Sequence, residues 1–316
     1  MIFINKIPLV VVSGPTASGK TSLGIQLAKK FNGEVVSADS MQIYKNLDIG
    51  TAKPSKAEMD GIVHHLIDIA DPTEDFSVER YCSLAKKAIA DIHSRGRLPI
   101  MVGGTGLYID NTVLETSFSA PKRDEAMTQK LRLFAEENGN EALYEILRKE
   151  DPIKAQTLHP NDVKRVIRAI ETVRTTGKTR AELDGESRPS VSSYNCLYMA
   201  IDMDRSTLYQ RIDARVDIML KQGLIDEVRK YILPDRSKMS TALSAIGYRE
   251  IIWYFKGLCT LSKAAELIKR NSRRYAKRQL TWLKRNSNII WLDFNNAFNQ
   301  AQQLIKERIL TDENTN

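Results

Sequence analysis

The stretch VVVSGPTASGKTSLG, residues 10–24, constrains this chain more than any other feature. It contains the pattern G-x-x-x-x-G-K-[ST] between a β-branched run typical of a buried strand and a run typical of a helix. Backbone amides of such a loop surround phosphoryl oxygens, and the positive end of the helix dipole strengthens the attraction. Lys20 supplies a mobile cation, and the Thr21 hydroxyl can hold Mg²⁺. The predicted phosphate-binding residues are Gly14, Pro15, Thr16, Ala17, Ser18, Gly19, Lys20 and Thr21.

The first 110 residues alternate strand and helix patterns. IPLVVVSG, GEVVSADS and LPIMVGGTG each have the texture of a short buried strand, and helical stretches separate them. This alternation predicts an α/β fold, a P-loop NTPase-like parallel sheet flanked by helices. The motifs GPTASGKT, SADSMQ and GGTGLY each follow a strand directly, so we expect them to meet at the carboxyl edge of the sheet.

Polar side chains in these motifs are candidates for binding or catalysis. Asp39 can act as a base, hold Mg²⁺ through water or cap a helix, and Ser40 and Gln42 can donate or accept hydrogen bonds that orient a nucleobase. Thr105 stands among glycines that allow a ligand close to the backbone, or that simply form a tight turn. The residues alone leave both interpretations open.

Two further pairs of residues stand out by their spacing. Arg211 and Arg215 lie four apart on one face of a predicted helix. They form ordinary surface ion pairs with neighbouring aspartates, or one of them points at a diphosphate. The pair His64–His65 has no metal-ligand spacing to a carboxylate cluster, and we interpret it as structural.

The chain changes character after the third predicted strand. Apolar residues three and four apart predict an all-helical segment, which a Pro/Ser/Gly-rich connector at residues 184–193 closes. The predicted organisation is a first part of the core at 1–115, a helical insertion at 116–193, and a return to the core at 194–316 with C-terminal basic helices.

The net charge of +8 is concentrated near the C-terminus, where KRNSRRYAKRQLTWLKR carries no acidic residue. Helical spacing places Arg270, Arg274 and Arg278 on one stripe, while Trp282 is expected to pack mainly in the core. Such a block is either a solvated helix face or a contact surface for a polyanion such as nucleic acid. The charge pattern alone favours neither.

Composition excludes several classes of protein. No apolar run approaches the ~20 residues of a membrane span, and the N-terminus does not resemble a secretory signal. The three cysteines are far apart and predict neither a disulfide framework nor a zinc site. We expect a soluble protein of the cytoplasm with no membrane partner.

The ordered motifs GPTASGKT, ADSMQIY, DIGTAKP, HHLID, GGTGLY, NDVKRVIRAIE, RIDARVDIM, AIGYRE and YAKRQLTW resemble those of the tRNA dimethylallyltransferases, also called tRNA isopentenyltransferases, of the bacterial type. The similarity runs from about Val10 to Trp282. It implies transfer of a dimethylallyl group from dimethylallyl diphosphate to N6 of the adenosine on the 3′ side of the anticodon, position 37. The P-loop then holds the diphosphate of the donor with Mg²⁺, and no ATP is consumed.

The resemblance also implies residue roles. Asp39 corresponds to the general base, and Thr105 and Arg215 to groups that contact the diphosphate. The insertion corresponds to the part that grips the anticodon stem-loop, and we expect the enzyme to act as a monomer. The implied tRNA-binding residues are Asp39, Ser40, Met41, Gln42, Thr105, Lys164, Arg165, Arg168, Gly247, Tyr248, Arg249, Lys277, Arg278 and Gln279. The departures are small: Ser272 replaces a usual threonine, and Arg249 a usual lysine.

Three other functions share parts of this pattern. An adenylate dimethylallyltransferase, acting on free nucleotides, would use Asp39 and Thr105 but has less need of the insertion. A P-loop small-molecule kinase would use the first half of the chain and leave the basic helices without a role. A non-enzymatic tRNA-binding protein would not need the intact Lys20, Thr21 and Asp39.

Overall fold

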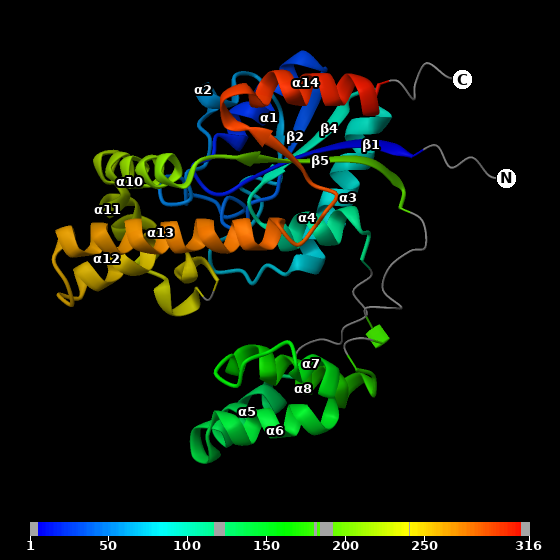
Figure 1. Cartoon of the computed structure of the whole chain (residues 1–316). Coiled ribbons are helices and arrows are strands. Elements are labelled where there is room, and N and C mark those ends of the chain that lie inside the picture. Colours follow the sequence, from blue (N-terminus) through cyan, green and yellow to red (C-terminus); the bar gives the residue numbers. More distant parts are fainter. Residues whose placement is uncertain (1–5, 117–123, 180–181, 184–191, 240, 311–316) are drawn as a thin grey trace. The chain divides into compact units, whose positions relative to one another are not determined.

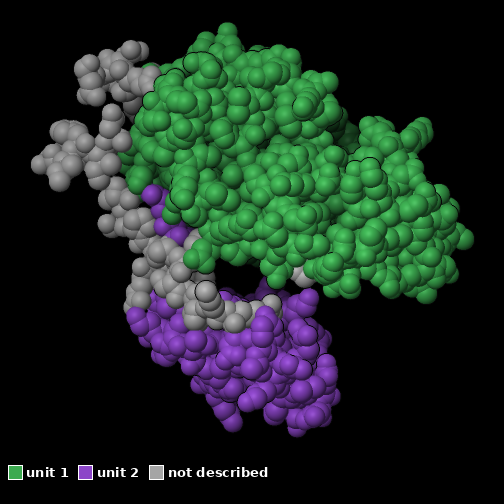
Figure 2. All heavy atoms as spheres, turned by 180° about the vertical axis from the view of Figure 1, so that it is seen from behind, with its two compact units in different colours: residues 1–113, 192–316 green, residues 114–191 purple. Residues whose placement is uncertain are grey.

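The computed structural model describes residues 6–116, 124–179, 182–183, 192–239 and 241–310. The chain divides into two compact units, one made of residues 1–113 and 192–316 and the other of residues 114–191 (Figure 2). The sequence predicted the inserted segment at 116–193, against 114–191 in the structure. The two units are described separately.

The larger unit is built on a parallel sheet of six strands in the order β3-β2-β4-β1-β5-β6 (Figure 1). The predicted strands are β1 (Ile7–Ser13), β2 (Gly33–Ser37) and β4 (Leu98–Gly103). The sheet continues with β5 (Tyr194–Asp202) and β6 (Ile290–Asp293), and its far edge is β3 (His64–His65). The predicted α/β fold with a parallel sheet is confirmed, and the histidine pair forms an edge strand.

The central strands are apolar on both faces because helices cover both. Leu9, Val10, Val11 and Val12 of β1 are all fully buried. Helices α1 (Lys20–Lys30) and α14 (Ala297–Arg308) share one apolar cluster with alternate residues of the sheet. Helix α3 (Val78–Ser94) contacts β1, β2 and β4, and α4 (Gly106–Val113) follows β4. This layering leaves the carboxyl ends of the strands as the edge at which loops gather.

A second group of helices belongs to the same unit. It consists of α2 (Lys56–Met59), α10 (Arg205–Lys221), α11 (Leu224–Glu227), the π-helix η1 (Val228–Ile232), α12 (Tyr248–Phe255) and α13 (Leu261–Leu283), with the short 3₁₀ turns η2 (Arg236–Lys238), η3 (Ala242–Ser244) and η4 (Phe294–Asn296). Helix α13 packs on α10 through a small cluster that includes Leu208, Ile212 and Ala276. Within the described ranges, no helix has both the length and the apolar composition needed to cross a bilayer.

The smaller unit is helical in its described part. Its helices are α5 (Glu125–Asn138), α6 (Asn140–Glu150), α7 (Pro152–Ala155) and α8 (Val163–Thr176). Asp124 caps α5 by accepting a hydrogen bond from the Met127 amide, and Gly177 ends α8 in the left-handed conformation at φ 68°. Leu143, Leu147, Val166 and Ile170 belong to a separate apolar core, in line with the helical periodicity of this segment.

Candidate active site

The P-loop between β1 and α1 contains residues with positive φ and one buried hydroxyl group without a partner in the described part of the chain. Gly19 at the N-cap of α1 has φ 92°, a value that favours glycine, and Ala17 adopts φ 65°. The Ser18 hydroxyl is buried, and no group in the described part of the chain hydrogen-bonds to it. A buried polar atom without a partner costs free energy unless a ligand satisfies it. The loop therefore carries an unsatisfied donor next to a helix N-terminus, which is suited to a phosphate oxygen.

The Lys20 ammonium group, at the start of α1, lies near the charged side chains of Asp39 and Arg215. Desolvation lowers the pKa of Lys20 to about 8, the Asp39 carboxylate opposes that shift, and Arg215 adds to it. The Lys20 Nζ donates to the Pro15 carbonyl oxygen at 3.3 Å. The structure thus brings two cations and one carboxylate of the expected set within electrostatic reach of one another.

The loops after β2 and β4 interlock through Thr105. The Thr105 Oγ1 accepts a hydrogen bond from the Ser40 amide at 3.0 Å, and the Thr105 amide donates to the Ala38 carbonyl oxygen at 3.1 Å. A Cβ at Gly103 would lie 2.1 Å from that same oxygen, so only glycine permits this approach. The Asp39 carboxylate accepts from the Met41 amide at 2.9 Å. Asp39 and Thr105 are therefore fixed by backbone contacts at the strand ends.

The two arginines of α10 point at the P-loop. The Arg211 Nε donates to the Ala17 carbonyl oxygen at 2.8 Å, and the Arg215 Nη1 to Thr16 Oγ1 at 3.3 Å. Burial lowers the pKa of Arg215. The neighbouring acids Asp213 and Asp217 form ion pairs with Arg273 and Lys269 of α13 instead. Of the two interpretations that the sequence left open, the structure favours arginines directed at the phosphate loop.

Two glutamines that were expected to contact tRNA are engaged inside the protein. Gln279 is 7% exposed; its Oε1 accepts from the Thr16 amide at 2.8 Å and its Nε2 donates to the Gly104 carbonyl oxygen at 2.9 Å. The Gln42 Nε2 donates to the carbonyl oxygens of Thr51 and Ala52, at 3.3 and 3.2 Å. Gln279 therefore joins the P-loop to the loop after β4. Gln42 instead contacts the loop that contains Thr51 and Ala52.

The AIGYRE motif also divides between the interior and the surface. Tyr248 is fully buried and donates its hydroxyl hydrogen to Glu227 Oε1 at 2.9 Å, so its side chain is not part of an exposed tRNA-binding surface. Gly247 precedes α12 at φ 107°. Arg249 is about half exposed, pairs with Glu250 at 3.1 Å and lies over the Trp253 ring. Of these three expected tRNA contacts, only Arg249 presents a charged side chain to solvent.

The remaining cations expected to bind tRNA are near the surface. Lys277 and Arg278 of α13 are exposed, and Arg278 lies over the Tyr275 ring at 5.7 Å. In the helical unit, Lys164 and Arg165 are exposed on α8, where Arg165 pairs with Asp162 at 2.8 Å. Arg168 on the same helix is half-buried and pairs with Glu171 at 3.5 Å. Both helices therefore carry exposed positive charge.

Two residues of α13 that the sequence did not assign to the site approach it. Burial raises the pKa of Tyr275 to about 12, and the nearby Thr105 side chain opposes that shift. The Trp282 Nε1 donates to Asp110 Oδ2 at 2.7 Å, and a Cβ on Gly106 would lie 2.2 Å from its ring. Trp282 is only partly buried and is not among the buried core residues, so the expectation of mainly core packing is not confirmed.

With this geometry in view, the chain can be compared with known proteins. A family model described as IPP transferase matches residues 42–286. The chain belongs to this family. It is 47% identical over 298 residues to a tRNA dimethylallyltransferase of Acetivibrio thermocellus, covering 94% of this chain and 95% of that one. It is 46% identical over 290 residues to a tRNA dimethylallyltransferase of Bacillus subtilis, covering 92% and 91%.

Solved structures of the family have the same architecture. A full-length tRNA isopentenylpyrophosphate transferase from Bacillus halodurans superposes with a TM-score of 0.73 at 43% identity, covering 98% of both chains. A eukaryotic dimethylallyltransferase, described as acting on tRNA, superposes with a TM-score of 0.82 at 31% identity, covering 96% of this chain and 80% of that one. The predicted family and fold are thereby confirmed.

Proposed function

We propose that this protein transfers a dimethylallyl group from dimethylallyl diphosphate to N6 of the adenosine 3′-adjacent to the anticodon, position 37, of tRNA. The observation that carries the proposal is the meeting of a phosphate loop, a carboxylate and a buried arginine at one edge of the sheet. Lys20, Asp39 and Arg215 lie within electrostatic reach of one another there. Membership of the IPP transferase family and its tRNA dimethylallyltransferase relatives support the same reaction.

The donor half of the reaction requires stabilisation of a leaving diphosphate. As the bond between C1 and oxygen breaks, negative charge develops on the diphosphate and positive charge on the allylic carbon. P-loop amides, the Ser18 hydroxyl, Lys20 and Arg215 would bind the oxygens in a site whose dipoles are already oriented. Thr105, tied to the same loops, would contact the diphosphate from the β4 side.

A magnesium ion suits the donors present. Mg²⁺ commonly takes one or two protein oxygens and completes its shell with water and substrate phosphates. The Thr21 hydroxyl follows Lys20 in the first turn of α1, and in the described residues no cluster of three or more His, Cys, Asp or Glu side chains forms an all-protein cage. Thr21 would hold the ion, which would supply positive charge against the departing diphosphate when bound.

The acceptor half requires a base, because the adenine amine is a poor nucleophile. We propose that N6 attacks C1, that the C1–O bond breaks, and that the N6 proton passes to the Asp39 carboxylate. A positioned base of this kind contributes about 10²–10⁴-fold in rate. The adenosine must leave its stack to reach Asp39. Exposed cations on α13 and α8 would bind the phosphates of the anticodon stem-loop, with the enzyme acting as a monomer in the cytoplasm.

A transfer assay tests this function. Labelled dimethylallyl diphosphate and Mg²⁺ are incubated with unmodified tRNA or with AMP, using the wild type and Asp39→Asn, which keeps the side-chain shape. We expect label to enter tRNA alone, and the rate to fall about 10²–10⁴-fold in the variant. Binding of tRNA should weaken steeply as salt increases, because phosphate contacts release counterions.

Each rival function would give a different result. Label entering only AMP would assign the protein to the adenylate dimethylallyltransferases. ATP hydrolysis with no prenyl transfer would indicate a P-loop kinase. Full activity of Asp39→Asn with tRNA would keep the reaction but remove Asp39 from the role of base.

A further inference from the structure

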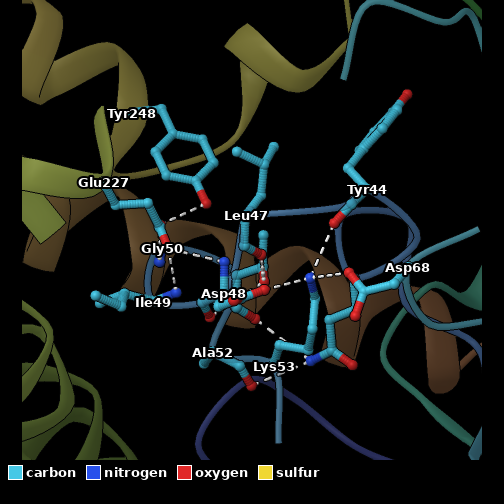
Figure 3. Close-up of polar contacts among 12 residues, drawn as sticks. Tyr44, Leu47, Asp48, Ile49, Gly50, Ala52, Lys53, Asp68, Glu227 and Tyr248 are labelled. Atoms are coloured by element: carbon cyan, nitrogen blue, oxygen red, sulfur yellow. Dashed lines mark hydrogen bonds and ion pairs between the residues drawn. The ribbon is translucent and has the colours of Figure 1, made fainter. Parts of the chain in front are cut away.

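One buried carboxylate outside the expected site is surrounded by hydrogen-bond donors. Glu227, at the last residue of α11, is 7% exposed. Its Oε2 accepts from the amides of Asp48 and Ile49, at 2.8 and 2.7 Å, and its Oε1 accepts from the Gly50 amide and the Tyr248 hydroxyl, both at 2.9 Å (Figure 3). We call this arrangement the Glu227 latch. Four donors on one carboxylate are a charge-assisted set and hold their loop firmly.

The loop and helix on either side of the latch are shaped to make it. A Cβ on Gly50 would lie 2.3 Å from the Tyr248 ring, so the loop can approach this tyrosine only with glycine there. Directly after Glu227 the chain forms the π-helix η1, an irregularity that often occurs at functional sites. The contact of the loop with Tyr248 therefore depends on Gly50, and the carboxylate stands directly before an irregular helical turn.

The same loop is fixed a second time, three residues farther on. The Lys53 side chain is only 5% exposed and donates to the Tyr44 carbonyl oxygen at 2.9 Å and to the carboxylates of Asp48 and Asp68 (Figure 3). Between the two anchors, Ala52 adopts φ 50°, in the left-handed region that is unfavourable for a residue with a Cβ. A strained residue persists only where its surroundings determine it, and such residues cluster at active sites.

The strained residue is the one that reaches the site. The Ala52 carbonyl oxygen accepts from Gln42 Nε2 at 3.2 Å and from Arg215 Nη2 at 3.5 Å. The other terminal nitrogen of Arg215, Nη1, donates to Thr16 Oγ1 of the P-loop at 3.3 Å. One carbonyl group therefore orients both an arginine assigned to the diphosphate and a glutamine beside Asp39.

We propose that Glu227 is a positioning residue for the transfer reaction, which acts through the loop at 48–52 to aim Arg215 at the diphosphate. The inference rests on the proposed function, since it assigns a purpose to the contact with Arg215. Glu227 itself touches no reacting atom. If the latch opens, the Ala52 carbonyl moves, and Arg215 loses one of its two fixed contacts.

The test compares two buried carboxylates of the same unit. Glu227→Gln keeps the shape but places an amide donor among four donors. Glu34→Gln is the matched control, because Glu34 is 2% exposed and lies at the opposite end of β2, away from the P-loop. Kinetics are measured for each variant at a temperature at which thermal melting shows it to be folded. Exchange of the backbone amides at 48–50 is followed by hydrogen-exchange mass spectrometry.

We expect Glu227→Gln to lower kcat/KM for dimethylallyl diphosphate by about 10–100-fold, since a small misplacement of a catalytic contact has effects of that size. The Kd for tRNA should remain within about twofold, and the amides at 48–50 should exchange faster. Glu34→Gln should melt at a lower temperature yet keep its kinetic parameters. A merely structural role for Glu227 would make the two variants alike in kinetics, and that result would overturn the proposal.

Two further measurements test the role of Glu227 if the variant does not fold or the wild type has no transferase activity. If Glu227→Gln does not fold, Tyr248→Phe removes one of the four donors and should lower the same kinetic parameter by a smaller factor; unchanged kinetics would refute the latch. If the wild type transfers no prenyl group, the proposed function fails. Calorimetric binding of inorganic diphosphate then tests the latch alone: weaker binding by Glu227→Gln supports it, and equal binding overturns it.

Discussion

Buried charges at the two ends of strand β2 are compensated to different degrees by their neighbours. At its carboxyl end, Lys20 and Arg215 are desolvated cations whose pKa values are lowered, with Asp39 as their common counter-charge. At its amino end, Glu34 meets Arg95 through two hydrogen bonds, at 2.6 and 2.7 Å. The His65 ring nitrogen and Arg97 complete that cluster.

The pKa values express this difference. The hydrogen bonds from Arg95 and His65 lower the pKa of Glu34 to about 2, which means that its charge is more than compensated. Desolvation instead lowers the pKa of Lys20 to about 8, which means that the charge of Lys20 is under-compensated. The amino end is complete without a ligand, whereas the carboxyl end would gain free energy from an added anion.

The largest expected effect comes from removing the under-compensated cation. Lys20→Met should lower kcat/KM for dimethylallyl diphosphate by about 10²–10³-fold, because one preorganised charge at a developing anion contributes that much. Steady-state kinetics with tRNA as acceptor measure it. Lys30→Met, at the exposed far end of α1, is the control and should retain activity. A loss below about tenfold in Lys20→Met would break the contrast between the two ends.

The pH dependence should sharpen the same contrast. Because the pKa of Lys20 is about 8, its ammonium group loses its proton in the free enzyme above that pH. The value of kcat/KM, which reports groups of the free enzyme, should then fall by up to about tenfold per pH unit. Lys20→Arg should move this fall to higher pH, since a guanidinium stays protonated. If kcat/KM has the same pH dependence in the wild type and in Lys20→Arg, a group other than Lys20 causes the fall.

The sequence predicted the fold well because the fold depends on local patterns. Short buried strands that end in glycine-rich motifs predicted the parallel sheet and the edge where the P-loop, Asp39 and Thr105 gather. Helical periodicity likewise predicted the separate core of α5, α6 and α8. These features need only the spacing of apolar residues and the position of turns.

The partners of side chains were harder to predict, because they come from residues far apart in the chain. Gln279 bonds to Thr16 across 263 positions, and Glu227 to Asp48 across 179. Motif similarity marked Gln279 and Tyr248 as tRNA contacts, but an amide or phenol gives no sign of whether it faces solvent or the interior. For Glu227, GLIDEV is ordinary helix sequence, so no local signal marked it.

The smallest effect on activity is expected at the compensated end, where Glu34→Gln should leave transfer unchanged and lower stability. Losing charge-assisted hydrogen bonds should reduce the free energy of unfolding by about 1.5–3 kcal/mol at neutral pH.

In the fold Glu34 stays ionised down to about pH 2, whereas in the unfolded chain it binds a proton below its ordinary pKa of 4.5. Its stabilising contribution is therefore complete above pH 4.5 and is lost as the pH falls toward 2. Thermal melting of the wild type and variant should show a gap at pH 7 that narrows at about pH 3; a gap independent of pH would mean that packing, rather than compensated charge, distinguishes this end of β2.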